Sequence, residues 1–218
     1  MSIQQDKIPE ATLQRLPVYL YRLQTLQADG VGRVSSRTLA AQLRINSSRL
    51  RQDFHHFGGF SRPGQTYEVS HLVERLREIL ALGAPVHYVI AGAGYLGQAI
   101  AAYPRFGEDG FRLAGIFDIN PKLIGLRFRG VAVQDIELLP ELVGRLGVKL
   151  GVITTSPEAA QGVAELMVRA GITGIWNFAP VGLQVPEAVT LQDEFLSAGL
   201  MALHYRMQEG ERGPEHRR

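Results

Sequence analysis

The chain has 218 residues, 45% of them hydrophobic, and a formal net charge of +2, which is typical of a folded soluble protein with one large or two small domains. It contains no cysteine, so disulfides, thiol chemistry and thiolate metal sites are excluded. No apolar run approaches the roughly 18 residues that span a bilayer, and the first ten residues lack the apolar core of a signal peptide. We therefore expect a cytoplasmic protein without membrane contact.

The charges are unevenly distributed along the chain. Residues 1–85 carry 11 Lys and Arg against 7 Asp and Glu, whereas residues 86–205 carry 8 against 11. Ten of the eleven N-terminal cations are arginine, the side chain suited to bidentate contacts with phosphate and guanine. This predicts a basic N-terminal module and a mildly acidic second one, although a solvated arginine-rich surface has the same composition. The six histidines lack metal-site spacing, and we expect no metal.

The N-terminal segment predicts several short helices. Leucines recur at spacings of three and four between residues 9 and 26, which indicates an amphipathic helix. Pro17 costs about 3 kcal/mol inside an uninterrupted helix, so we expect either a kink or a short helix followed by a longer one that starts at Pro17. Helices over 37–44 and 49–57 follow, with hydroxyl or amide caps at 35–36 and 46–48. Their tight connection is typical of a helix-turn-helix, although helical hairpins that bind no DNA are also common.

A glycine-bounded segment follows these two helices. Residues 58–67, with Arg62 near the tip, predict a β-hairpin wing whose guanidinium could contact phosphates or enter a minor groove. A connecting helix is expected over 69–82. Pro85 then stops that helix, so we place the domain boundary at 83–85.

The second module begins with a glycine-rich turn. An apolar run at 86–91 breaks into Gly92-Ala93-Gly94-Tyr95-Leu96-Gly97 and then into a helix-forming segment. Gly92 permits the tight exit from the strand, Gly94 lets the backbone approach a pyrophosphate, and Gly97 lets the helix pack on its strand. A second apolar run ends at Asp118, where a carboxylate can accept both hydroxyls of an adenosine ribose. The alternative is a tight turn without function, which the following strand and acid disfavour.

Strands and helices alternate through the rest of this module. Strands are expected over 130–133 and 149–153, one more strand with its exit loop over 174–180, and helices over 137–146 and 158–171. This order predicts a parallel sheet with both faces covered. Ligands bind beyond the carboxyl ends of such strands, so residues 92–97, 118, 155–157 and 177–180 should line one crevice. A last helix over 193–207 carries an apolar stripe that packs on its own sheet or on a partner, and the charged tail 208–218 is expected to be disordered.

Several stretches match one family in order. They are Pro9-Glu10-Ala11, Leu50-Arg51-x-Asp53, Phe57-Gly58, GAGYLGQAI, Tyr103-Pro104, Phe117-Asp118, ITTSPEAAQ from Ile153, and Asn177-Phe178-Ala179-Pro180. From Ile8 to about Leu203 the chain resembles the Rex repressors, bacterial sensors of the NADH/NAD+ ratio. The resemblance implies an α/β protein with an N-terminal winged helix-turn-helix domain, a Rossmann-like doubly wound parallel sheet and a domain-swapped C-terminal helix. The corresponding boundaries are 1–84 for DNA binding, 85–191 for NAD(H), 192–207 for dimerisation and 208–218 for the tail.

The resemblance also implies roles for individual residues. NAD(H) would contact Gly92, Ala93, Gly94, Tyr95, Leu96, Gly97, Tyr103, Asp118, Thr155, Ser156, Pro157, Asn177, Phe178, Ala179 and Pro180. Tyr103 matches a tyrosine that moves with the redox form. Asp118 without a following arginine favours NAD(H) over NADP(H). Double-stranded DNA would contact Arg15, Ser47, Ser48, Arg51, Gln52, His55, Arg62 and Gly64.

The chain departs from the family pattern where function would be transmitted. Family members usually show R-K-D-L-S in the recognition helix, and Gln52 replaces the lysine here, which favours adenine over guanine. The family's wing usually reads R-G-x-G-Y. Here residues 63–67 read Pro-Gly-Gln-Thr-Tyr, so one glycine of that pattern is missing and the arginine lies one position earlier, at Arg62. In an ungapped match Phe195 and Tyr21 occupy the positions of an aspartate and an arginine of the family's polar relay, and apolar Phe195 cannot serve in it. Asp193 or Glu194, with Arg22, are the alternatives.

These residues suggest three alternative functions. The first is a homodimeric, NAD(H)-responsive transcriptional repressor, and the second is an NAD(H)-binding dimer that has lost operator recognition or redox response and acts through protein partners. The third is an NAD-dependent oxidoreductase or a CoA-ligase-like subunit, since such enzymes share the glycine loop and the sheet pattern. For hydride transfer, however, the strand exits supply Thr, Ser, Asn and Phe without a convincing acid–base group. We therefore expect a DNA-binding regulator and no enzyme.

Overall fold

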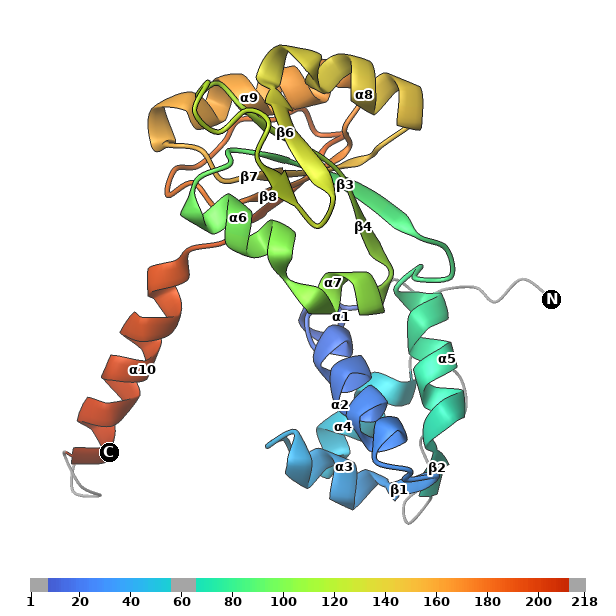
Figure 1. The fold of residues 1–218 in the computed structure, drawn as a ribbon. Coiled ribbons are helices and arrows are strands. Elements are labelled where there is room, and N and C mark those ends of the chain that lie inside the picture. Colours follow the sequence, from blue (N-terminus) through green and yellow to red (C-terminus); the bar gives the residue numbers. More distant parts are fainter. Residues whose placement is uncertain (1–7, 56–65, 212–218) are drawn as a thin grey trace. The chain divides into compact units, whose positions relative to one another are not determined.

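The computed structural model describes residues 8–55 and 66–211 (Figure 1). They form two compact units whose boundary falls between Ala84 and Pro85. Within the described ranges, no helix is both long enough and apolar enough to cross a membrane.

The N-terminal unit is mainly helical. Its described elements are α1 (Glu10–Leu13), α2 (Leu16–Ala28), β1 (Arg33–Ser35), α3 (Ser36–Gln42), α4 (Ser47–His55), β2 (Thr66–Glu68) and α5 (Val69–Ile79). Pro17 lies in the first turn of α2, where its missing N–H costs nothing, so the second expectation for the proline is confirmed. Leu16, Leu20 and Leu23 point from α2 into the core.

Side-chain caps start the two helices of the expected helix-turn-helix. Ser35 Oγ accepts from the N–H of Thr38 at 3.0 Å ahead of α3, and Asn46 Oδ1 accepts from the N–H of Ser48 at 2.7 Å in α4. After α4, the structure resumes at β2, which pairs antiparallel with β1. The predicted wing tip, with Arg62 and Gly64, lies outside the described residues.

The C-terminal unit is built on a seven-stranded sheet with the order β5-β6-β4-β3-β7-β8-β9. The strands are β3 (Val86–Ala91), β4 (Phe111–Asp118), β5 (Arg127–Phe128), β6 (Val131–Asp135), β7 (Leu150–Ile153), β8 (Gly174–Asn177) and β9 (Thr190–Asp193). All neighbouring pairs are parallel except β5 with β6. Because β3 has β4 on one side and β7 on the other, the strand order reverses at β3, where ligands bind in such sheets. The doubly wound fold class is confirmed.

Helices cover both faces of the sheet (Figure 1). They are α6 (Tyr95–Ala102) and α7 (Pro104–Asp109) on one face, and α8 (Leu139–Leu146, after a 3-10 turn at Ile136–Leu138) and α9 (Pro157–Ala170) on the other. The last helix, α10 (Leu196–Glu211), follows β9 and is not among the helices that cover the sheet. Alternate residues of β3 face two apolar clusters, one shared with α8 and α9 and the other with α6, as the two-residue period of a strand requires.

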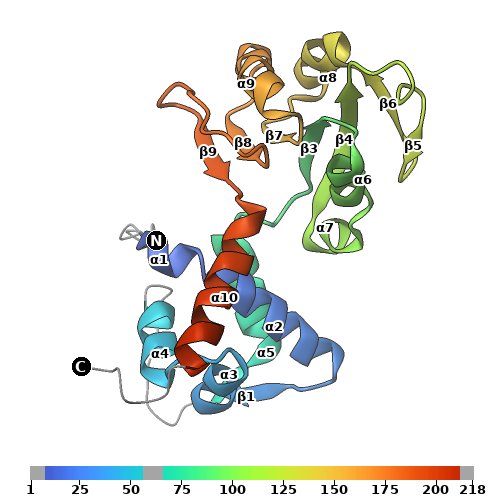
Figure 2. The same cartoon turned by 90° about the vertical axis from the view of Figure 1, so that its left-hand side faces the viewer.

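The sequence expectations for this unit were wrong at the edges of the sheet and at the last helix. The strands β5 and β9 were not predicted. Asp193 ends β9, in register with Asn177, so it does not open the last helix, and the sheet continues past the expected domain end at 191. The helix α10 follows after two residues (Figure 2) and continues to Glu211, where glutamine and glutamate favour helix; residues 208–211 are therefore helical and not a disordered tail.

Candidate functional site

Two of the three motif glycines are required by the fold, and the third is not. Gly92 has a φ of +101°, and a Cβ there would lie 2.7 Å from the backbone of Thr154. A Cβ on Gly97 would overlap the carbonyl oxygen of Gly92, so α6 packs too closely for any side chain. A Cβ on Gly94, in contrast, meets nothing within 4 Å. The open surface at Gly94 is therefore available for a group from outside the chain.

Asp118 lies at the entrance of this glycine turn. Its Oδ2 accepts a hydrogen bond from the N–H of Ala93 at 2.6 Å, and its Oδ1 accepts one from the N–H of Asn120 at 2.8 Å. A carboxylate has about four acceptor positions, so each oxygen can still accept from a ribose hydroxyl. The same side chain thus holds the turn and could hold a sugar.

The end of β7 supplies two threonines with different roles. Thr154 Oγ1 donates to the carbonyl oxygen of Gly92 at 2.7 Å, which fixes the glycine turn against β7. Thr155 Oγ1 is buried and, within the described parts of the chain, has no hydrogen-bond partner. A buried hydroxyl without a partner costs roughly 1–3 kcal/mol, and a polar ligand at this strand end would satisfy it.

The loop after β8 continues the same edge of the sheet. Asn177 is fully buried, and the N–H of Phe178 donates to the carbonyl oxygen of Ile153 at the end of β7 at 2.9 Å. The ring of Phe178 lies 4.4 Å from that of Trp176, and Trp176 contacts Phe106, which in turn contacts Tyr103 at 5.0 Å. An aromatic chain therefore links the half-exposed Tyr103 to this loop.

The predicted cofactor residues are thus brought to one edge of the sheet. Hydrogen bonds join the glycine turn to Asp118 and to the end of β7, and the end of β7 to the loop after β8. Sequence reasoning missed Thr154, whose only signal was its place directly before Thr155. In the described ranges no group of three or more His, Asp or Glu could hold a metal ion.

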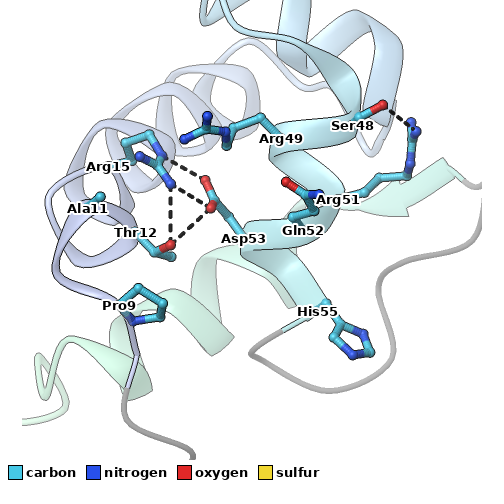
Figure 3. Close-up of a pocket in the computed structure, with 10 residues that line it drawn as sticks. All are labelled: Pro9, Ala11, Thr12, Arg15, Ser48, Arg49, Arg51, Gln52, Asp53 and His55. Carbon is cyan, nitrogen blue, oxygen red and sulfur yellow. Dashed lines mark hydrogen bonds and ion pairs between the residues drawn. The ribbon is translucent and has the colours of Figure 1, made fainter.

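A second concave surface lies in the N-terminal unit, between α1, α2 and α4 (Figure 3). We call it the α4 hollow. It has a volume of about 690 Å³ and is lined by Pro9, Ala11, Thr12, Arg15, Ser48, Arg49, Arg51, Gln52, Asp53 and His55. Five of the lining residues are predicted DNA contacts, namely Arg15, Ser48, Arg51, Gln52 and His55. The predicted contact Ser47 begins α4 but does not line the hollow. Arg49 lines it and was not predicted from the sequence. Figure 3 shows the guanidinium of Arg49 extended from α4 towards Arg15.

A buried carboxylate organises the α4 hollow. Asp53 is 2% exposed and accepts from Arg15 Nη2 at 2.6 Å, Arg15 Nε at 2.7 Å, the Tyr19 hydroxyl at 2.6 Å and the Thr12 hydroxyl at 3.0 Å. Burial alone would raise the pKa of the Asp53 carboxyl, but these hydrogen bonds outweigh it and hold the pKa below its ordinary value. The bond to Asp53 also raises the pKa of Arg15. Arg15 is therefore a fixed cation, and with Arg49 and Arg51 it leaves the hollow net positive.

The candidate relay residues have partners inside their own units. Arg22 Nε donates to Gln42 Oε1 at 2.9 Å, and Asp193 Oδ1 accepts from Asn177 Nδ2 at 2.8 Å. Phe195 lies between β9 and α10 with half of its surface exposed. A relay through Asp193 or Glu194 and Arg22 stays a prediction.

Comparisons with known proteins agree with the division into two units. Residues 7–55 match a family model described as "Putative DNA-binding protein N-terminus", and residues 85–181 match the "CoA binding domain". A protein of Thermoanaerobacter pseudethanolicus named redox-sensing transcriptional repressor Rex is 43% identical over 205 residues, covering 94% of this chain and 92% of the relative. A protein of the same name from Clostridium tetani is 41% identical, covering 94% and 97%.

Solved structures of one relative are similar over almost the whole chain. The crystal structure of RSP in complex with β-NADH has a TM-score of 0.86 and 41% sequence identity, and covers 94% of this chain and 96% of that one. The structure of RSP in complex with β-NAD+ and operator DNA has a TM-score of 0.85 at 41% identity, and covers 97% and 95%.

Proposed function

The chain belongs to the Rex family of redox-sensing transcriptional repressors, and from this premise we propose that it represses transcription by binding operator DNA, under the control of NAD(H) held by its C-terminal unit. The observation that carries the proposal is the contrast among the motif glycines. The fold uses Gly92 and Gly97 for close packing, whereas the surface at Gly94 is open at the position where a pyrophosphate approaches the backbone.

The cofactor would lie along the carboxyl edge of the sheet. Residues 92–97 would hold the pyrophosphate at the N-terminus of α6, and Asp118 would accept the adenosine ribose hydroxyls. Residues 155–157 and 177–180, with Tyr103, would contact the nicotinamide side, where the Thr155 hydroxyl needs a partner. The negative charge of Asp118 disfavours the 2′-phosphate of NADP(H). The cofactor supplies the redox signal, and the side chains of residues 155–157 and 177–180 offer no acid–base pair for hydride transfer, which favours a regulator over an enzyme.

DNA would bind at the α4 hollow. Arg15, Ser48 and Arg51 are suited to phosphates, and Gln52 to the major-groove edge of adenine. Ser47, His55 and the predicted wing residues Arg62 and Gly64 complete the proposed contacts.

A homodimer would present two such surfaces to a two-fold operator. Apolar side chains along α10 are more than half exposed, namely Leu196, Leu200, Met201, Leu203, Tyr205 and Met207. We propose that a second copy of the chain covers them. Four of them, Leu196, Leu200, Leu203 and Met207, recur at spacings of three and four and therefore form one stripe, and an exposed apolar stripe of this length marks an interface.

Cofactor binding is testable with the sole tryptophan, Trp176, as an energy-transfer donor to NADH. NADH should quench its emission in the wild type, NADPH should do so only at higher concentration, and Asp118→Ala should weaken NADH binding. No quenching and no heat of binding from NADH would refute the cofactor proposal. DNA binding is tested by selection from random duplexes: a single enriched palindrome supports the repressor, whereas a folded dimer that selects nothing at low salt supports a role through protein partners.

A further inference from the structure

The side chain of Asn177 joins two parts of the C-terminal unit. Asn177 ends β8 and is fully buried. Its Nδ2 donates to the carbonyl oxygen of Val181 at 2.9 Å and to Asp193 Oδ1 at 2.8 Å, and its Oδ1 accepts from the N–H of Ala179 at 3.0 Å. All polar atoms of this amide are therefore used.

These bonds hold two different segments. The bonds with Ala179 and Val181 shape the loop that follows β8, which the proposed function assigns to the nicotinamide. The bond with Asp193 holds the end of β9. The main chain of Asn177 adds a fourth contact, because its carbonyl oxygen accepts from the N–H of Glu194 at 2.8 Å.

The segment held by Asp193 is the root of α10. Only two residues separate Asp193 from the first residue of the helix, Leu196. The first apolar side chains of α10 are largely exposed, with Leu196 at 61% and Leu200 at 71%, so within a single chain they do not fix its direction. Within one chain, the bonds of Asn177 with Asp193 and Glu194 are the contacts that hold the root of α10.

We propose that Asp193 is a positioning residue that couples the dinucleotide site to α10, because the loop at the nicotinamide and the root of the helix share the buried amide of Asn177. A cofactor that contacts residues 178–181 stabilises the bonds of the Asn177 amide with Ala179 and Val181, and the amide in turn holds Asp193. The coupling is reciprocal, so an α10 held by a partner favours cofactor binding equally. This inference rests on the proposed function, since it requires NAD(H) at the loop.

The test is amide hydrogen exchange of the full-length protein with and without NADH. In the wild type, NADH should slow exchange both in residues 178–181 and at the root, residues 194–198, by about tenfold or more. Asp193→Ala should keep the protection of the loop and lose that of the root. Asp193→Asn should behave as the wild type, because its amide oxygen still accepts from Asn177 Nδ2. Glu187→Ala is the control, because it removes an exposed carboxylate from the segment between β8 and β9. It should also behave as the wild type.

Each alternative result has a distinct meaning. Two results would overturn the coupling and leave the proposed function intact. In the first, NADH still slows exchange at residues 194–198 in Asp193→Ala. In the second, bound NADH does not slow exchange at these residues in the wild type. A wild type in which NADH neither quenches Trp176 nor protects the loop would instead overturn the proposed function. Asp193→Val, which suits an edge strand, is the second disrupting variant if the alanine variant does not fold.

Discussion

Replacement of Asp53 by alanine should destabilise the N-terminal unit strongly. The carboxylate side chain is 3% exposed and forms an ion pair with Arg15 at 2.6 Å. It is also the acceptor for the Tyr19 and Thr12 hydroxyls, which lie in residues only 1% and 3% exposed. Alanine would leave two buried hydroxyls and one cation without their acceptor.

The loss of folding free energy in Asp53→Ala depends on which of the lost hydrogen bonds water can replace. Removal of one partner of a buried ion pair costs roughly 3–5 kcal/mol. The Arg15 side chain is 25% exposed, so water can replace part of what it loses. Water cannot reach the two buried hydroxyls, and each buried hydroxyl without an acceptor costs roughly 1–3 kcal/mol. We therefore expect a loss of about 3–5 kcal/mol, a large part of the roughly 5–15 kcal/mol that holds a domain folded. Tyr19→Phe, which leaves three of the four bonds, should cost about 1.5–3 kcal/mol.

Urea unfolding followed by two signals measures this effect. Far-ultraviolet circular dichroism includes the helices of the N-terminal unit, whereas the fluorescence of Trp176 reports on the C-terminal unit only. Asp53→Ala should shift the dichroism transition and leave the fluorescence transition in place. The exposed Asp29→Ala is the matched control and should change stability by less than about 0.5 kcal/mol. A loss below about 1 kcal/mol for Asp53→Ala would refute the assignment of Asp53 as the organising group.

Four further results are expected. Gly94→Ala should leave the melting temperature unchanged and weaken NADH binding at least tenfold, whereas Gly97→Ala should unfold the C-terminal unit; an NADH titration and a melting curve check both, and equal NADH affinity for Gly94→Ala would contradict the pyrophosphate assignment. Because the folded pKa of Asp53 is lowered from 3.8, its stabilisation is complete above about pH 5 and is lost as the pH falls through the folded value; urea midpoints that do not fall on acidification would count against it. Gln52→Lys should move base preference from adenine towards guanine by about 1–3 kcal/mol at one base pair, and unchanged competition between duplexes in gel shifts would exclude that contact. Arg49→Gln should reduce the slope of log affinity against log salt by about 0.9 if Arg49 neutralises one phosphate, and an unchanged slope places Arg49 away from the DNA backbone.

The sequence was sufficient for the large elements of the fold. The glycine turn, the alternation of strands and helices, and the proline at the start of α2 carry local signals, because each depends on backbone freedom or on periodicity within a few residues. The edge strands escaped detection since β5 has only two residues, and β9 has one apolar residue among its four. Asp193 was consequently placed in the helix that follows it.

The candidate sites were predictable in position but not in their internal contacts. Residues 92–97 and Asp118 were found through their spacing. The contacts around Asp53 join residues 34 to 41 positions apart, and no local pattern reports such pairs. Similarly, the bond of Thr154 to the glycine turn spans 62 positions and follows only from the pairing of β3 with β7.

The most direct test of the account is the affinity of the protein for a selected duplex, titrated separately with NADH and NAD+. The relative RSP was solved with NAD+ and operator DNA together, so we predict that this protein stays bound to the duplex at saturating NAD+. We predict that NADH releases the duplex. In Asp118→Ala, neither dinucleotide should change the affinity for the duplex. Equal affinity for the duplex at saturating NADH, at saturating NAD+ and without either would contradict control of DNA binding by the cofactor.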